Sequence, residues 1–128
     1  MNANEMLVRD GYAAFGAGDL ALLEAMFSPD CVWHEPGNSP ISGTYKGWPE
    51  TARLFGEYAQ RSGGTFTAEL HDVLANDTYA FSIATVRGDR EGRHLDQGDH
   101  VLFTVRDGRI VDARAFYHDQ AAVDAFWA

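Results

Sequence analysis

Cysteine is almost absent from this 128-residue chain, which contains only Cys31. A single thiol cannot form an internal disulfide, so the core alone must hold the fold, and a cytoplasmic location is expected. Basic residues are also scarce, because 10 lysines and arginines stand against 19 aspartates and glutamates, a formal net charge of −9. Nucleic acid and anionic membranes are not attracted to such a chain, so neither is expected as a partner.

Long apolar runs are missing as well. No stretch approaches the roughly 18 residues that a membrane-spanning helix needs. The N-terminus also has no basic segment followed by an apolar block, the pattern of a signal peptide. The length is that of one domain, which we place at residues 1–128.

Metal, phosphate and nucleophile motifs are not found either. The five histidines form no His-x-His pair, and strand alternation turns His34 away from Glu35. The segment 88–92 is acidic and precedes no helix, unlike a phosphate-binding loop. Cys31 has no basic neighbour on its own face to activate the thiol. We therefore predict neither a metal site nor a cofactor.

The spacing of apolar residues changes along the chain from a helical period to a strand period. Three helices are predicted first, over residues 3–16, from Asp19 to the break at 28–30, and from Pro49 to 62–64. Alternation then predicts four strands, over 66–74, 79–87, 94–106 and 110–118. A short final helix is predicted over 119–127. This order predicts an α+β fold in which a cone-shaped, curved antiparallel sheet wraps over three N-terminal helices and encloses a cavity.

A short strand at residues 31–35 carries the first candidate for chemistry. Alternation puts Cys31, Trp33 and Glu35 on one face, just before Pro36 and Gly37 end the pairing. A carboxylate on an apolar face is costly unless it is hydrogen-bonded, protonated or used. Glu35 is therefore a candidate catalytic residue, although an exposed strand end would also explain it.

The register of the last hairpin decides what lies beside Asp99, the second candidate. A two-residue turn at 107–108 would set Phe116 opposite Asp99, whereas a three-residue loop would set Ala115 there. We favour the three-residue loop, because it keeps both charged residues of the last strand outside the cavity. It turns four residues inward: Val111, Ala113, Ala115 and Tyr117. An edge position or an arginine partner for Asp99 is the structural alternative.

If Glu35 and Asp99 lie on the same apolar lining, their pKa values should be raised and should differ from each other. Such a pair can act as acid and base near neutral pH. Tyr12 and Tyr117 are the candidate donors to an oxyanion. The substrate, a small apolar ligand that contains a ring, is expected to bind four aromatic residues: Trp33, Phe55, Phe103 and Tyr117. If these residues serve only the core, the chain is a non-catalytic ligand-binding or assembly module.

Several stretches resemble the nuclear transport factor 2-like superfamily, and within it the branch of SnoaL-like polyketide cyclases and ketosteroid isomerases. They are Tyr12 to Asp19 with Leu22-Leu23 and Phe27 to Trp33, then Asp99-His100-Val101 and Asp107 to Val111. The resemblance implies the cone-shaped fold, a homodimer formed through the outer sheet face, and proton transfer without a cofactor.

Carried over by position, Glu35 stands where the isomerases keep their proton-shuttling aspartate. Asp99 stands where they keep an acid that donates to the substrate oxyanion. Gly11 occupies the place of their oxyanion tyrosine, with Tyr12 one residue later. The expected activity is an isomerase, cyclase or related proton transfer on a small apolar carbonyl or polyketide-like compound.

Overall fold

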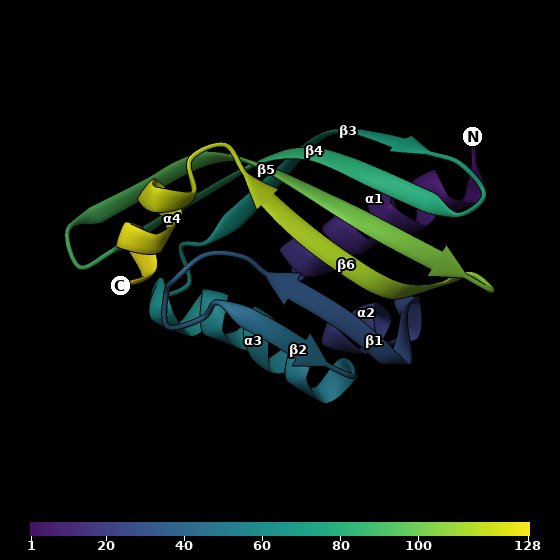
Figure 1. Cartoon of the computed structure of the whole chain (residues 1–128), viewed down its shortest axis with the longest axis horizontal. Coiled ribbons are helices and arrows are strands. Elements are labelled where there is room, and N and C mark those ends of the chain that lie inside the picture. The colour runs from purple at the N-terminus through teal and green to yellow at the C-terminus, as the bar shows by residue number, and fades with distance from the viewer.

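The computed structural model describes residues 1–128 as four helices and one six-stranded sheet (Figure 1). In chain order the elements are α1 (Ala3–Ala17), α2 (Leu20–Met26), β1 (Phe27–Glu35), β2 (Gly43–Lys46), α3 (Trp48–Arg61), β3 (Thr67–Ala75), β4 (Tyr79–Arg90), β5 (Arg93–Arg106), β6 (Arg109–Tyr117) and α4 (Gln120–Trp127). The predicted α+β fold, a curved sheet over three N-terminal helices, is confirmed. None of the helices is long and apolar enough to cross a bilayer.

The strands follow the order β2-β1-β6-β5-β4-β3. All neighbours are antiparallel except β1 and β6, which run parallel. Figure 1 shows the long strands β3 to β6 bending over α1, while α3 packs against β1 and β2. This curvature leaves the concave face of the sheet turned toward the helices, where the core and the cavity lie.

Local signals explain where the helices begin and end. The side chain of Asn2 caps the first amides of α1, and Gly18 ends that helix in a left-handed conformation that glycine adopts without strain. Asp19 caps α2. One expectation needs adjustment, since residues 28–30 lie inside β1 rather than in a break. The short strand β2, after Gly37, was not predicted.

The β5–β6 hairpin has a register that neither sequence alternative described. Its turn has two residues, with both Asp107 and Gly108 at positive φ, and Arg106 pairs with Arg109. The register then shifts by one residue at Val111, which is an extra residue in β6, as in a β-bulge. Beyond the shift, Asp99 pairs with Tyr117.

The predicted three-residue loop, with Ala115 opposite Asp99, is therefore wrong. The predicted inward position of Val111 is also wrong, because Ile110 is the buried residue there. The alternation beyond the bulge nevertheless turns the predicted residues inward: Ala113 and Ala115 are buried, and Tyr117 faces the cavity. Phe116 is 46% exposed on the outer face.

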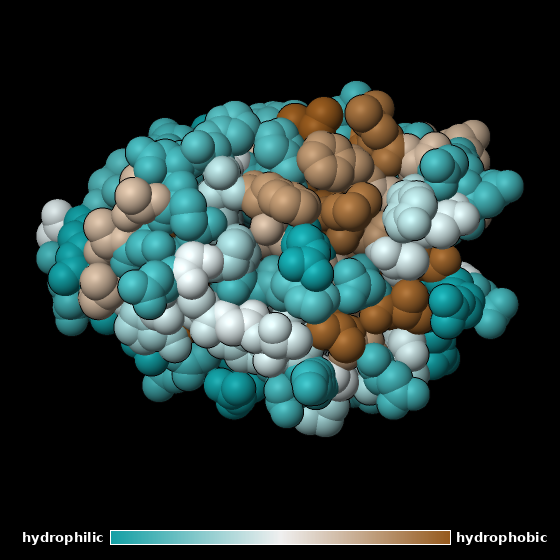
Figure 2. All heavy atoms as spheres, in the orientation of Figure 1, coloured by the Kyte–Doolittle hydropathy of each residue, from teal (hydrophilic) through white to brown (hydrophobic).

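The outer face of the sheet also carries apolar side chains. Figure 2 shows them gathered over β4, β5 and β6, and three of the exposed ones are Leu74, Tyr79 and Phe116. The homodimer implied by the family resemblance would form on this face. It stays a prediction for the single chain described.

Candidate active site

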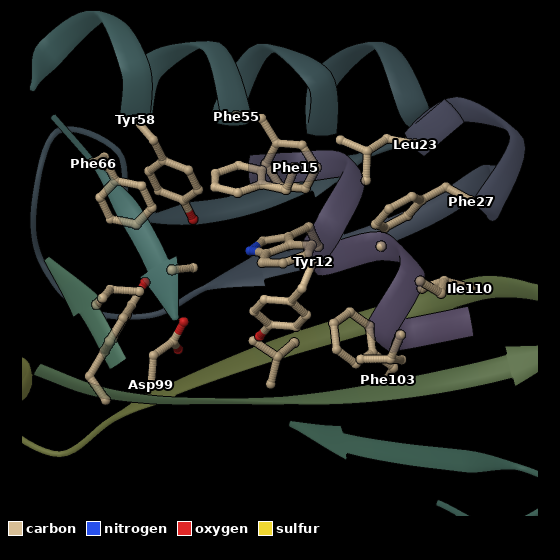
Figure 3. Close-up of a pocket in the computed structure, with 17 residues that line it drawn as sticks. Tyr12, Phe15, Leu23, Phe27, Phe55, Tyr58, Phe66, Asp99, Phe103 and Ile110 are labelled. Atoms are coloured by element: carbon tan, nitrogen blue, oxygen red, sulfur yellow. The ribbon is translucent and has the colours of Figure 1, made fainter. Parts of the chain in front are cut away.

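A pocket lies between the concave face of the sheet and helices α1 to α3 (Figure 3). Of the 17 residues that line it, 15 are hydrophobic. The aromatic ones are Tyr12, Phe15, Phe27, Trp33, Phe55, Tyr58, Phe66, Phe103 and Tyr117. A lining of this kind suits a ligand with an apolar ring system.

Asp99 is the single carboxyl group in the lining. It lies in the middle of β5 and is 7% exposed. Its buried Oδ1 atom has no hydrogen-bond partner. Burial raises the pKa of Asp99 from 3.8 to about 8, and the negative charge of Glu35 adds to the rise. Asp99 is therefore mostly protonated at pH 7, and it is free to exchange a proton with a ligand.

Glu35 is buried at the end of β1, as alternation predicted, but it does not line the pocket. Three side chains donate to its carboxylate. The Trp33 indole Nε1 lies 3.1 Å from Oε1, which also accepts from the Tyr58 hydroxyl, and the Tyr117 hydroxyl lies 2.7 Å from Oε2. Burial raises the pKa of Glu35, while the three donors oppose the rise.

The two carboxyl groups thus have different surroundings. Tyr58 and Tyr117 line the pocket themselves, so Glu35 lies behind a layer of aromatic side chains. Burial raises the pKa of Tyr58 and of Tyr117, and the negative charge of Glu35 raises both further. Asp99 faces the pocket without such donors.

Tyr12 on α1 faces the same pocket, and its hydroxyl lies 2.7 Å from the Oγ atom of Ser82. Burial and the nearby charge of Asp99 raise the pKa of Tyr12, so the phenol remains a hydrogen-bond donor at neutral pH. Gly11 beside it also lines the pocket. Ser82 was not predicted as a site residue, because a lone serine in a strand has no pattern beyond its inward alternation.

Six of the seven predicted site residues come together on this lining: Tyr12, Trp33, Phe55, Asp99, Phe103 and Tyr117. Glu35 is the seventh, and it contacts Trp33 and Tyr117 from behind. Tyr58 was not predicted as a site residue, although its hydroxyl reaches Glu35 from α3.

The chain is similar to known proteins. Residues 8–113 match the model of a family described as SnoaL-like domain. An uncharacterized protein of Mycobacterium tuberculosis (strain H37Rv) is 40% identical over 123 residues, which cover 95% of this chain and 94% of that protein.

Two solved structures are similar over nearly their whole length. Bal32a, from a soil-derived mobile gene cassette, is 38% identical with a TM-score of 0.96, over 98% of this chain and 97% of its own. A protein of unknown function with a cystatin-like fold from Xanthomonas campestris is 33% identical with a TM-score of 0.92, over 100% and 99%. The chain belongs to the SnoaL-like domain family.

Proposed function

We propose that this protein is a cofactor-free enzyme that transfers a proton within a ring-containing carbonyl compound, as an isomerase or a cyclase does. One observation carries the proposal: Asp99 is a buried carboxyl group that faces an apolar pocket with an unpaired oxygen. A group whose pKa lies near 8 is a much stronger base than an ordinary aspartate, yet part of it is ionised at neutral pH. Such a group suits removal of a proton from carbon.

The proposed first step breaks a C–H bond next to the carbonyl group. Ionised Asp99 takes the proton, the electron pair of that bond forms the carbon–carbon double bond of an enolate, and the negative charge moves to the carbonyl oxygen. The Tyr12 hydroxyl donates a hydrogen bond to this oxygen. The pocket has few other polar groups, so each such interaction is stronger than it would be in water.

The second step decides the overall reaction. If Asp99 returns its proton to a different carbon of the enolate, the compound is isomerised. If the enolate carbon attacks a second carbonyl group of the same molecule, a ring closes and Asp99 protonates the new alkoxide. Both routes leave the enzyme unchanged and need no redox partner.

Glu35 contributes from behind the pocket wall. It holds the hydroxyl groups of Tyr58 and Tyr117, and its charge helps to keep the pKa of Asp99 high. In this proposal Glu35 positions side chains and tunes the base, whereas Asp99 contacts the substrate. The aromatic lining binds the ring system of the substrate by apolar contact.

Deuterium exchange at carbon tests the proton transfer without knowledge of the natural substrate. The probe is 2-acetylnaphthalene in D₂O, with loss of the methyl proton signal followed by NMR. The wild-type protein is expected to accelerate the exchange, and Asp99→Asn to reduce it by at least about a hundredfold, the usual contribution of a general base. Asp96→Asn is the matched control, because Asp96 lies on the same strand and is exposed.

The dependence of exchange on pH gives a second test. The rate is expected to rise with pH, to reach half its maximum near pH 8, where half of Asp99 is ionised, and to level off at higher pH. Equal rates for Asp99→Asn and wild type would refute the role of Asp99. If the ketone binds and wild-type protein does not accelerate its exchange, the protein is a non-catalytic binding module.

A further inference from the structure

Three tyrosines line the pocket, and the hydroxyl groups of two of them already donate hydrogen bonds within the protein. Tyr58 and Tyr117 donate to the carboxylate of Glu35. A phenol has one hydrogen to donate. Neither hydroxyl can therefore donate to a ligand while it is bound to Glu35, and Tyr12 is the remaining candidate.

The direction of the Tyr12–Ser82 hydrogen bond follows from counting donors and acceptors. Ser82 is fully buried in β4, and its Oγ atom accepts from the amide of Val101, 3.1 Å away. The hydroxyl of Ser82 has one hydrogen of its own to place. The neighbouring atom able to accept it is the Tyr12 hydroxyl oxygen, 2.7 Å away. If Tyr12 donated instead, the serine hydrogen would be buried without a partner, at a cost of about 1–3 kcal/mol.

We propose that Ser82 is a positioning residue that donates to Tyr12, so that the Tyr12 hydrogen points into the pocket toward a carbonyl or enolate oxygen of the ligand. The inference deepens the proposed function and rests on it for the identity of that oxygen. It places the polar end of the ligand between Tyr12 and Asp99 and its ring system among the aromatic side chains.

The surroundings of Ser82 support this arrangement. The amide of Val101 is part of the β4–β5 ladder, in which Ser82 and Val101 are direct partners, so the serine oxygen is held by the sheet. Figure 3 shows the Tyr12 hydroxyl and the Asp99 carboxyl on the same side of the pocket, above β5. The hydrogen bond with Ser82 also lowers the pKa of Tyr12 against the larger effect of burial.

A pair of ligands of the same shape measures the effect. The first is 2-acetylnaphthalene, and the second is 2-isopropenylnaphthalene, in which a CH₂ group replaces the oxygen. Both are titrated into the protein with quenching of tryptophan fluorescence as the signal, since Trp33 lines the pocket. The ratio of their affinities reports hydrogen bonding to the oxygen, while a general change in packing alters both affinities together.

The two directions of the hydrogen bond predict opposite results. If Ser82 donates to Tyr12, Ser82→Ala lets the Tyr12 hydrogen turn away, and preference for the ketone falls by about three- to tenfold. Tyr12→Phe lowers it at least as much. If Tyr12 donates to Ser82, Ser82→Ala frees that hydrogen and raises the preference, and Tyr12→Phe leaves it unchanged. Either of these last two results would overturn the proposal.

Thr51→Val is the matched control. Thr51 is fully buried, and its hydroxyl contacts Gly47 and Cys31, neither of which lines the pocket. Its loss should leave the affinity ratio unchanged. If Ser82→Ala does not fold, Tyr12→Phe still decides the direction, because it keeps the serine. The measurement needs no turnover, so a failure of proton transfer at Asp99 and a failure of this inference give separate results.

Discussion

The raised pKa of Asp99 makes the stability of the protein depend on pH. The substitution Asp99→Asn removes this dependence and so allows it to be measured. A carboxyl group whose pKa is 3.8 when unfolded and about 8 when folded retains its proton in the folded protein over this interval and loses it in the unfolded chain. The folded state then binds more protons than the unfolded state, so the free energy of unfolding falls as pH rises. Below the lower value and above the higher one, Asp99 contributes no further change.

The size of the effect follows from the shift. One pKa unit corresponds to about 1.4 kcal/mol, so ionisation of Asp99 costs wild-type protein about 4 kcal/mol of stability between pH 5 and pH 8 relative to a variant without this group. Asp99→Asn removes the ionisable group at nearly constant volume. Its stability relative to wild type should therefore increase by about that amount between pH 5 and pH 8.

Urea denaturation of both proteins at half-unit steps of pH measures this difference, with the m-value checked for constancy. Glu35 also has a raised pKa, but it is present in both proteins and largely cancels in the comparison. Parallel stability profiles for wild type and Asp99→Asn would refute the reasoning, because they would show that Asp99 titrates near its ordinary value.

Three further substitutions test other parts of the structure. Tyr117→Phe removes a donor to Glu35 and should lower the free energy of unfolding in urea by about 1–3 kcal/mol. The loss should be larger at pH 8 than at pH 5, because that donor favours ionised Glu35. An equal loss at both pH values would count against this role of Tyr117. Gly37→Ala should lower the melting temperature, because Gly37 has φ +101° and an added Cβ atom would overlap the Asp124 carboxylate on α4. An unchanged melting temperature would contradict this contact. Leu54→Ala, at a fully buried position, should cost about 2–5 kcal/mol by chemical denaturation, whereas a loss below about 1 kcal/mol would argue against its place in the core.

Local patterns in the sequence were enough to predict much of the site. Alternation in the strand at 31–35 put Trp33 and Glu35 on the buried face, and both are buried. The same reasoning placed Asp99 and Phe103 together on the cavity face of one strand. Such predictions succeed because side chains alternate in every strand, whatever the strand pairs with.

The hairpin register shows where this reasoning ends. The turn at Asp107 and Gly108 is visible in the sequence, but the extra residue at Val111 is not. A bulge depends on how β6 fits both its hairpin partner β5 and the strand β1, which is far away in the chain. It decides that Tyr117, and not Phe116, lies beside Asp99 on the cavity side.

By itself the sequence determined most of the inward residues, because alternation and helical spacing are properties of the local backbone. Only the tertiary structure decided what each inward polar group meets. Helix α3 and strand β6 bring Tyr58 and Tyr117 to Glu35, whereas no donor reaches the Oδ1 atom of Asp99. The difference between the two acids lies in hydrogen bonds between segments far apart in the chain, which no local pattern encodes.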